Sequence, residues 1–117
     1  MKLKLKALTK QLNIHLNELK EKYEKNSPPE NRRDKQFFSM VKEETTPIYH
    51  MLDRWETMGL EAVKKREINV HPHQISSTKE NMELLLMHSY YIDARKKRYM
   101  ELNKSVKYIF DQMVREL

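Results

Sequence analysis

The sequence predicts an all-α protein, an antiparallel four-helix bundle with one additional short helix at about 34–44. Two features of composition lead to this fold class. Leu, Lys, Glu and Met are abundant, and all four residue types favour helix, while glycine occurs only once in 117 residues. The third observation is that apolar residues recur every three or four positions, which places them on one face of successive helices. A chain of this length suits one domain, covering 1–117.

The first predicted helix covers about Lys2–Lys25. Its apolar positions are spaced by three or four residues, and they are Leu5, Leu8, Leu12, Leu16, Leu19 and Tyr23. The segment Asn26-Ser27-Pro28-Pro29 ends the helix, because proline has no N–H to donate and disfavours helix at the residue before it. We therefore expect a loop after residue 25.

The short helix at about 34–44 is predicted from a cap and an interruption. Asp34 is suited to cap its start, and its inward-facing residues are predicted to be Phe37, Phe38 and Val41. Thr45-Thr46-Pro47 then reads as a stop and a restart, because threonine caps helices and proline is accepted at the first helical position. This pattern predicts two separate helices on either side of Pro47.

A longer helix is predicted from Pro47 onward. Its inner positions are spaced by three or four residues, and they are Ile48, Leu52, Trp55, Gly59 and Ala62 or Val63. Gly59 has two interpretations: it permits a neighbouring helix to approach closely, or it weakens the helix by about 1 kcal/mol.

The last apolar pattern predicts two further helices. It comprises Ile75, Met82, Leu85 and Leu86, then Tyr99, Leu102, Val106, Ile109 and Met113. One helix over the roughly 44 residues that follow the loop around Ile68–Val70 would measure roughly 66 Å at 1.5 Å per residue, too long for a compact domain of this size. We therefore predict a break between Ser89 and Lys96.

Two histidines in the segment Asn69-Val70-His71-Pro72-His73 raise the question of a metal site. Zinc and iron sites need three or four converging ligands, and this pair supplies two at most. A helix start explains the segment better, with His71 as the cap and Pro72 at the first helical position. Val70 and Ile75 would then pack across the cap as a hydrophobic staple.

Arg66 and His71 form the R-x4-H arrangement of all-helical HEPN-type ribonucleases. In such a site the arginine would stabilise phosphate charge and the histidine would transfer protons, without a metal. The pattern is weak in a chain so rich in Arg and Lys.

Basic residues suggest nucleic-acid binding as an alternative function. The formal net charge is +6, and the first helix carries seven lysines against three glutamates. The densest basic run is Arg95, Lys96, Lys97 and Arg98, flanked by tyrosines that could stack on bases. The tyrosines also follow the spacing of core residues, so this alternative is not favoured.

Several classes of function lack their residues. Cysteine is absent, which excludes disulfides, thiolate nucleophiles and cysteine-based zinc sites. A single glycine excludes most phosphate-binding loops, and no cofactor motif is present. No apolar run approaches the roughly 20 residues of a membrane span, so we expect a cytosolic protein with no membrane partner.

A set of residues distributed along the chain resembles the YppE-like family of small helical proteins from Gram-positive bacteria. The matching positions are Phe37-Phe38, Val41-Lys42, Arg54-Trp55, Val70-His71, Gln74-Ile75, Lys79, Asn81, Leu85, Ser89-Tyr90 and Lys96-Lys97-Arg98. They cover roughly residues 35–110. The resemblance implies a cytosolic four-helix bundle and, because the family has no established activity, it assigns no functional residues. Pro72 departs from the pattern, where a residue such as lysine is expected.

Together these observations favour a non-catalytic cytosolic bundle that acts through protein–protein contacts with an unidentified partner, or with a second copy as a homodimer. Nucleic-acid binding through the first helix or residues 95–98 is the alternative, and a ribonuclease using Arg66 and His71 is a third hypothesis.

Overall fold

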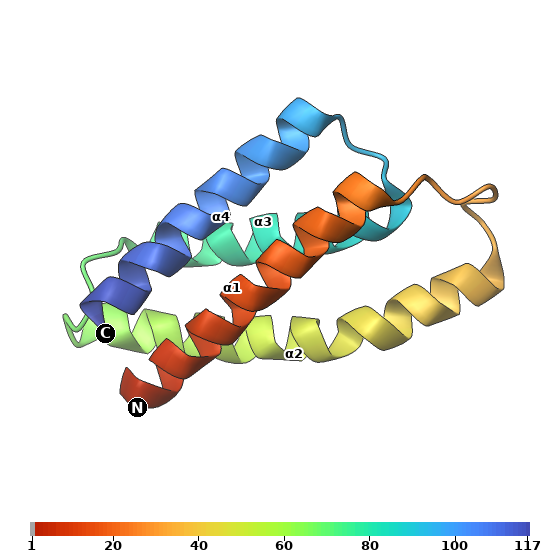
Figure 1. The fold of residues 1–117 in the computed structure, drawn as a ribbon. Helices are drawn as coiled ribbons and strands as arrows, with labels where there is room; N and C mark the ends of the chain where they lie inside the picture. The colour runs from red at the N-terminus through yellow and green to blue at the C-terminus, as the bar shows by residue number, and fades with distance from the viewer. Residues whose placement is uncertain (1) are drawn as a thin grey trace.

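Four helices account for most of residues 2–117, the part of the chain that the computed structural model describes. They are α1 (Lys2–Lys25), α2 (Lys35–Lys64), α3 (Pro72–Tyr91) and α4 (Lys96–Glu116), and successive helices run antiparallel (Figure 1). The predicted all-α four-helix bundle is confirmed. The long dimension of the molecule is 48 Å, close to the roughly 45 Å expected for the 30 residues of α2.

The helices form two pairs, which we call the α1–α4 layer and the α2–α3 layer. Figure 1 shows the α1–α4 pair inclined to the α2–α3 pair. The buried apolar side chains of all four helices form one cluster. Its largest fully buried members are Trp55, Tyr99, Phe110, Leu5, Leu12, Leu16, Leu52, Ile75, Met82, Leu85, Leu86 and Met113. The core therefore joins the two layers.

The separate short helix at about 34–44 is wrong, because α2 continues through Pro47. The threonine hydroxyls do not cap a new helix. Thr45 Oγ1 donates to the carbonyl of Val41 (2.8 Å) and Thr46 Oγ1 to that of Lys42 (2.6 Å). Buried residues of α2 continue at helical spacing across the proline, and they are Val41, Thr45, Ile48, Leu52 and Trp55. Burial of this continuous stripe outweighs the cost of a proline inside a helix, about 3 kcal/mol.

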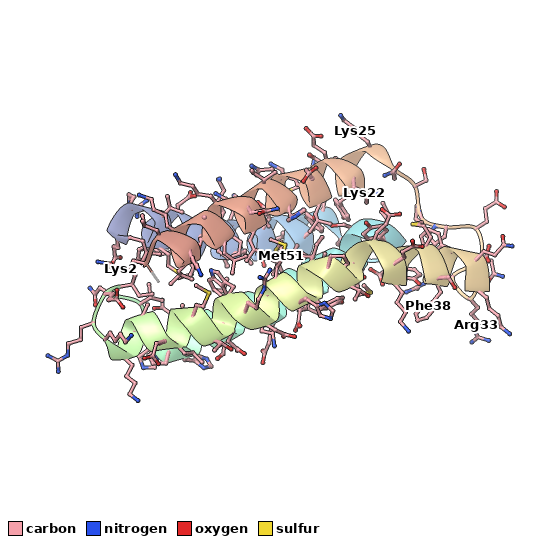
Figure 2. The ribbon with its side chains drawn as sticks, turned by 90° about the horizontal axis from the view of Figure 1, so that it is seen from below. Lys2, Lys22, Lys25, Arg33, Phe38 and Met51 are labelled. Atoms are coloured by element: carbon pink, nitrogen blue, oxygen red, sulfur yellow. The ribbon has the colours of Figure 1, made fainter. Side chains whose placement is uncertain are left out.

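The start of α2 differs in a second detail from the prediction. Val41 is buried and Phe37 is half-buried, but Phe38 points outward with 58% of its surface exposed. Phe38 lies 100° from Phe37 around the helix, so the two cannot share one narrow inner face. Figure 2 shows Phe38 at the outer end of α2, away from α1.

Gly59 of α2 packs closely against α3. A Cβ atom added at this position would lie 3.3 Å from Cδ1 and Cγ2 of Ile75 in α3. Because this is tighter than ordinary van der Waals contact, the first interpretation of this glycine, close approach of a neighbouring helix, agrees with the structure.

The predicted break between the last two helices is confirmed. α3 ends at Tyr91 and α4 begins at Lys96, within the interval from Ser89 to Lys96. Ile92 adopts the left-handed conformation (φ 52°) and its N–H donates to the carbonyl of His88. A β-branched residue adopts this conformation rarely, so the chain reversal here carries backbone strain.

Candidate functional site

Arg66 closes the C-terminus of α2. Its φ is 60°, its N–H donates to the carbonyl of Val63, and the next N–H, of Glu67, donates to the carbonyl of Ala62. These two bonds define a Schellman motif, in which the left-handed position is usually glycine. The Arg66 side chain is exposed. Its place in the structure is explained by backbone geometry.

His71 caps the N-terminus of α3, as predicted. Its ring Nδ1 accepts from the N–H of His73 at 3.0 Å, while its own N–H donates to Gln74 Oε1 at 2.9 Å. Val70 and Ile75, on either side of the cap, are both buried at the positions of a hydrophobic staple. Among residues 2–117, no hydrogen bond or ion pair joins Arg66 to His71.

The two neighbouring histidines, His71 and His73, are both exposed. His73 Nε2 lies 3.3 Å from Ser77 Oγ. Over the described part of the chain, no three His, Asp or Glu side chains are placed to hold a metal ion.

The basic run from Arg95 to Arg98 lies at the N-terminus of α4. Arg95 is the N-cap residue without a side-chain cap bond, and Arg95, Lys96, Lys97 and Arg98 are all exposed. Cations are disfavoured at this end of a helix dipole. The next residue, Tyr99, is fully buried, so this run does not present its flanking aromatic ring to solvent.

Tyr99 instead joins three helices. Its ring stacks on that of Tyr23 in α1 with centroids 4.0 Å apart, and its hydroxyl lies 2.6 Å from Ser89 Oγ in α3. Burial raises the pKa of Tyr99 to about 12. The phenol is neutral at physiological pH and acts as a structural hydrogen-bonding group.

A second cluster, not predicted from the sequence, connects the α1–α2 loop (26–34) to the α3–α4 loop (92–95). His88 Nδ1 lies 2.7 Å from Asp93 Oδ1, and Arg32 Nη2 lies 3.0 Å from Asp93 Oδ2. Tyr23 also donates to the carbonyl of Ala94. The available signal was that His88 directly precedes the predicted break and Asp93 lies within it. Nothing in the sequence indicated that Arg32, on the other loop, would pair with Asp93.

A groove between α1 and α2 combines apolar side chains with charged ones. It consists of two hollows, of about 250 Å³ and about 360 Å³, which share Lys22 and Tyr90. The apolar lining residues are Leu19, Phe37, Met40, Pro47 and Ile48. Figure 2 views the molecule with α1 and α2 side by side, with Lys22 on α1. We call this feature the α1–α2 groove.

A bridge of three side chains separates the two hollows. Lys22 Nζ lies 4.6 Å above the ring of Tyr90, and the Tyr90 hydroxyl donates to Glu44 Oε1 at 2.9 Å. Burial raises the pKa of Tyr90, and the hydrogen bond to Glu44 raises it further. Glu18 and Glu43 complete the charged rim, so acidic residues outnumber the single lysine. The groove suits an apolar segment with basic flanks.

Charge is distributed unequally between the two layers. The sequences of α1 and α4 contain thirteen basic and six acidic residues, whereas α2 and α3 contain five basic and seven acidic. The two basic helices, α1 and α4, pack against each other. No helix within residues 2–117 has both the length and the apolar character needed to cross a membrane.

Comparison with known proteins places the chain in a family. Residues 9–117 match the model of a bacterial domain of unknown function (DUF1798), so the chain belongs to this family. It is also similar to uncharacterized protein YppE of Bacillus subtilis (strain 168). The two are 32% identical over 85 residues, which cover 68% of this chain and 69% of YppE. The resemblance inferred from the sequence is confirmed.

Solved structures of YppE show the same fold. The X-ray crystal structure of the Bacillus subtilis protein is 26% identical, with a TM-score of 0.86 over 99% of this chain and 94% of YppE. The solution NMR structure is 27% identical, with a TM-score of 0.76 over 97% of this chain and 91% of YppE. The family and fold are thereby established, and the uncharacterized protein YppE brings no specific function.

Proposed function

We propose that this chain is a non-catalytic cytoplasmic protein that acts through protein–protein contacts at the α1–α2 groove. The observation that carries the proposal is the combination of an apolar lining with an acidic rim in one groove. The absence of cysteine suits a reducing compartment.

The chemistry of the groove defines its partner. Phe37, Met40 and Pro47 present apolar surface in the groove, and Glu18 and Glu43 on the rim favour cations. An amphipathic helix with apolar residues one turn apart and Lys or Arg beside them matches this surface. A partner of this kind would contact both α1 and α2.

Site-specific photo-crosslinking in cells tests the proposal. A photoreactive residue in place of Met40, which lines the groove, is expected to give a discrete crosslinked partner. The matched control is Leu84 on α3, an apolar residue of similar exposure (42% against 36%) that does not line the groove. Charge reversal by Glu18→Lys with Glu43→Lys should remove the product at position 40.

Equal products at positions 40 and 84, or none at either, would contradict the proposal. Size-exclusion with light scattering then identifies the case in which the partner is a second copy, because the mass would double and Glu18→Lys with Glu43→Lys would restore the monomer.

A further inference from the structure

The outward face of α4 carries an aligned set of cations around an exposed aromatic ring. Lys97, Lys104, Tyr108 and Arg115 are separated by seven, four and seven residues, so they form one stripe along the helix. All four are exposed, and Tyr108 has 65% of its surface open to solvent. Lys107 lies beside the stripe. This surface is separate from the α1–α2 groove and includes only Lys97 from the basic run at 95–98.

The acidic residues of α4 are fewer than its basic residues, and two of them are already bound to other side chains or to the backbone. Asp111, on the same stripe, accepts from Asn13 Nδ2 of α1 at 3.1 Å and lies 3.7 Å from Lys107 Nζ. Glu116 accepts from the N–H of Asn69 and from Gln112 Nε2. Glu101 is the third acidic residue of α4, against six basic ones. The stripe is therefore a net attractor of anions.

Two grooves run along the sides of this stripe. The one between α3 and α4 has a volume of about 440 Å³, and its lining includes Gln74, Ser77 and Asn81 opposite Lys104 and Tyr108. None of its lining residues is acidic. The groove between α1 and α4, of about 410 Å³, places Lys10 opposite Arg115. Amides and hydroxyls that can both donate and accept thus lie beside cations and an aromatic ring.

We infer that this face of α4 binds single-stranded nucleic acid. Lys104, Lys107 and Arg115 contact phosphates of one strand, and an unpaired base stacks on Tyr108. Amides of the α3–α4 groove, such as Asn81, reach the edge of that base. A duplex would not satisfy this site, because its bases are already stacked on one another and unavailable to the tyrosine ring.

Fluorescence anisotropy with short labelled oligonucleotides tests the inference. The probes are one RNA and one DNA single strand of the same mixed sequence, and the duplex of each. Single strands are expected to bind more tightly than duplexes. Affinity should fall as salt rises, with a log–log slope of roughly 0.7 per phosphate contacted. The RNA and DNA arms show whether the 2′-hydroxyl contributes.

Variants of the stripe separate stacking from charge. Tyr108→Ala should weaken single-strand binding about fivefold to a hundredfold, while Tyr108→Trp retains it. Lys104→Gln should reduce the salt slope by roughly 0.7. Phe38→Ala, at another exposed aromatic residue, and Lys42→Gln, at an exposed lysine of α2, are the matched controls and should change neither quantity. All of these positions are exposed on their helices, so thermal unfolding of the variants should match that of the parent.

Three results would overturn the inference: no binding even at low salt, duplexes bound as tightly as single strands, or Tyr108→Ala with unchanged affinity. Binding that depends on lysines alone is non-specific attraction of polyanions. Glu18→Lys with Glu43→Lys leaves this surface intact, so failure here is distinct from failure at the α1–α2 groove.

Discussion

The two layers of the bundle use their charges differently. In the α2–α3 layer, Lys79 of α3 lies 3.0 Å from Asp53 and 3.6 Å from Glu56 of α2, so ion pairs connect the helices. In the described part of the α1–α4 layer, ion pairs remain within one helix: His15–Glu18, Glu21–Lys25 and Lys107–Asp111. One layer places ion pairs between its helices, and the other leaves most cations facing solvent. The basic surface of α1 and α4 therefore forms no ion pairs between these two helices in the described part of the chain.

The largest effect is expected where the layers meet. Trp55 of α2 is fully buried, lies edge-on to Phe110 of α4 (centroids 5.3 Å apart), and donates from Nε1 to Thr9 Oγ1 of α1 at 3.0 Å. Trp55→Ala should lower the free energy of unfolding by about 3–5 kcal/mol, because it leaves a large cavity between the layers. Denaturant unfolding measures this loss. Trp55→Phe, which keeps a ring but not the hydrogen bond, should lose less, and a loss below about 1 kcal/mol for Trp55→Ala would show that the layers do not depend on this contact.

The packing within the α2–α3 layer can be tested at Gly59. Gly59→Leu should lower the free energy of unfolding by about 1–3 kcal/mol, because the side chain would overlap Ile75. Gly59→Ala is the matched control. Its contact at 3.3 Å opposes a helix-propensity gain of about 1 kcal/mol, so it should remain within about 1 kcal/mol of the parent. Similar stabilities for the leucine variant and the parent would mean that the layer is loosely packed.

The turn between α2 and α3 contains Arg66, a left-handed residue whose replacement by glycine should increase stability. Arg66→Gly should raise the free energy of unfolding by about 0.5–1 kcal/mol, because glycine adopts the left-handed conformation without steric cost. The neighbouring Lys65, with φ −82°, has no such cost, and Lys65→Gly should reduce stability. Opposite signs at adjacent positions, measured by denaturant unfolding, would verify the Schellman geometry. A loss of stability in both variants would contradict it.

The smallest effect concerns the surplus of carboxylates in the α2–α3 layer. Burial raises the pKa of Glu83, while Lys79 lowers it and Asp53 raises it. Because the folded-state pKa lies above the unfolded value, this residue favours folding most when protonated, and its contribution decreases as pH rises through the folded pKa. Glu83→Gln should therefore raise Tm modestly at neutral pH and have no such effect below the ordinary glutamate pKa. An equal Tm difference at both pH values would contradict this account.

Much of the fold was predictable because local rules and tertiary packing agree. His71 and Asp34 cap their helices with the expected bonds, and the heptad spacing from Tyr99 to Met113 lies inside the core. The failure at Pro47 has a physical cause: proline and threonine have favourable local alternatives at a helix start, but the buried stripe on both sides of Pro47 favours one continuous helix. Tertiary burial decided a choice that local propensity left open.

The candidate sites were harder to predict from the sequence. Arg95 to Arg98 were the obvious basic residues, yet their neighbour Tyr99 is buried, and the exposed aromatic ring of α4 is Tyr108. The helical spacing of Lys97, Lys104 and Arg115 was readable, but which face of α4 is exposed depends on its contacts with α1 and α3. The α1–α2 groove depends on Tyr90 reaching Glu44 from another helix, which no linear spacing encodes.

Trp55 is the only tryptophan of the chain, and its position makes it an optical probe of the bundle. The indole is shielded from water, with its single N–H bonded to Thr9, so its emission should lie toward the blue while the layers are docked. Separation of the layers would expose the indole and move the emission to longer wavelength. Ligands on the exposed face of α4 do not reach the ring. Tryptophan emission can therefore follow unfolding while a labelled oligonucleotide reports binding at α4 in the same sample.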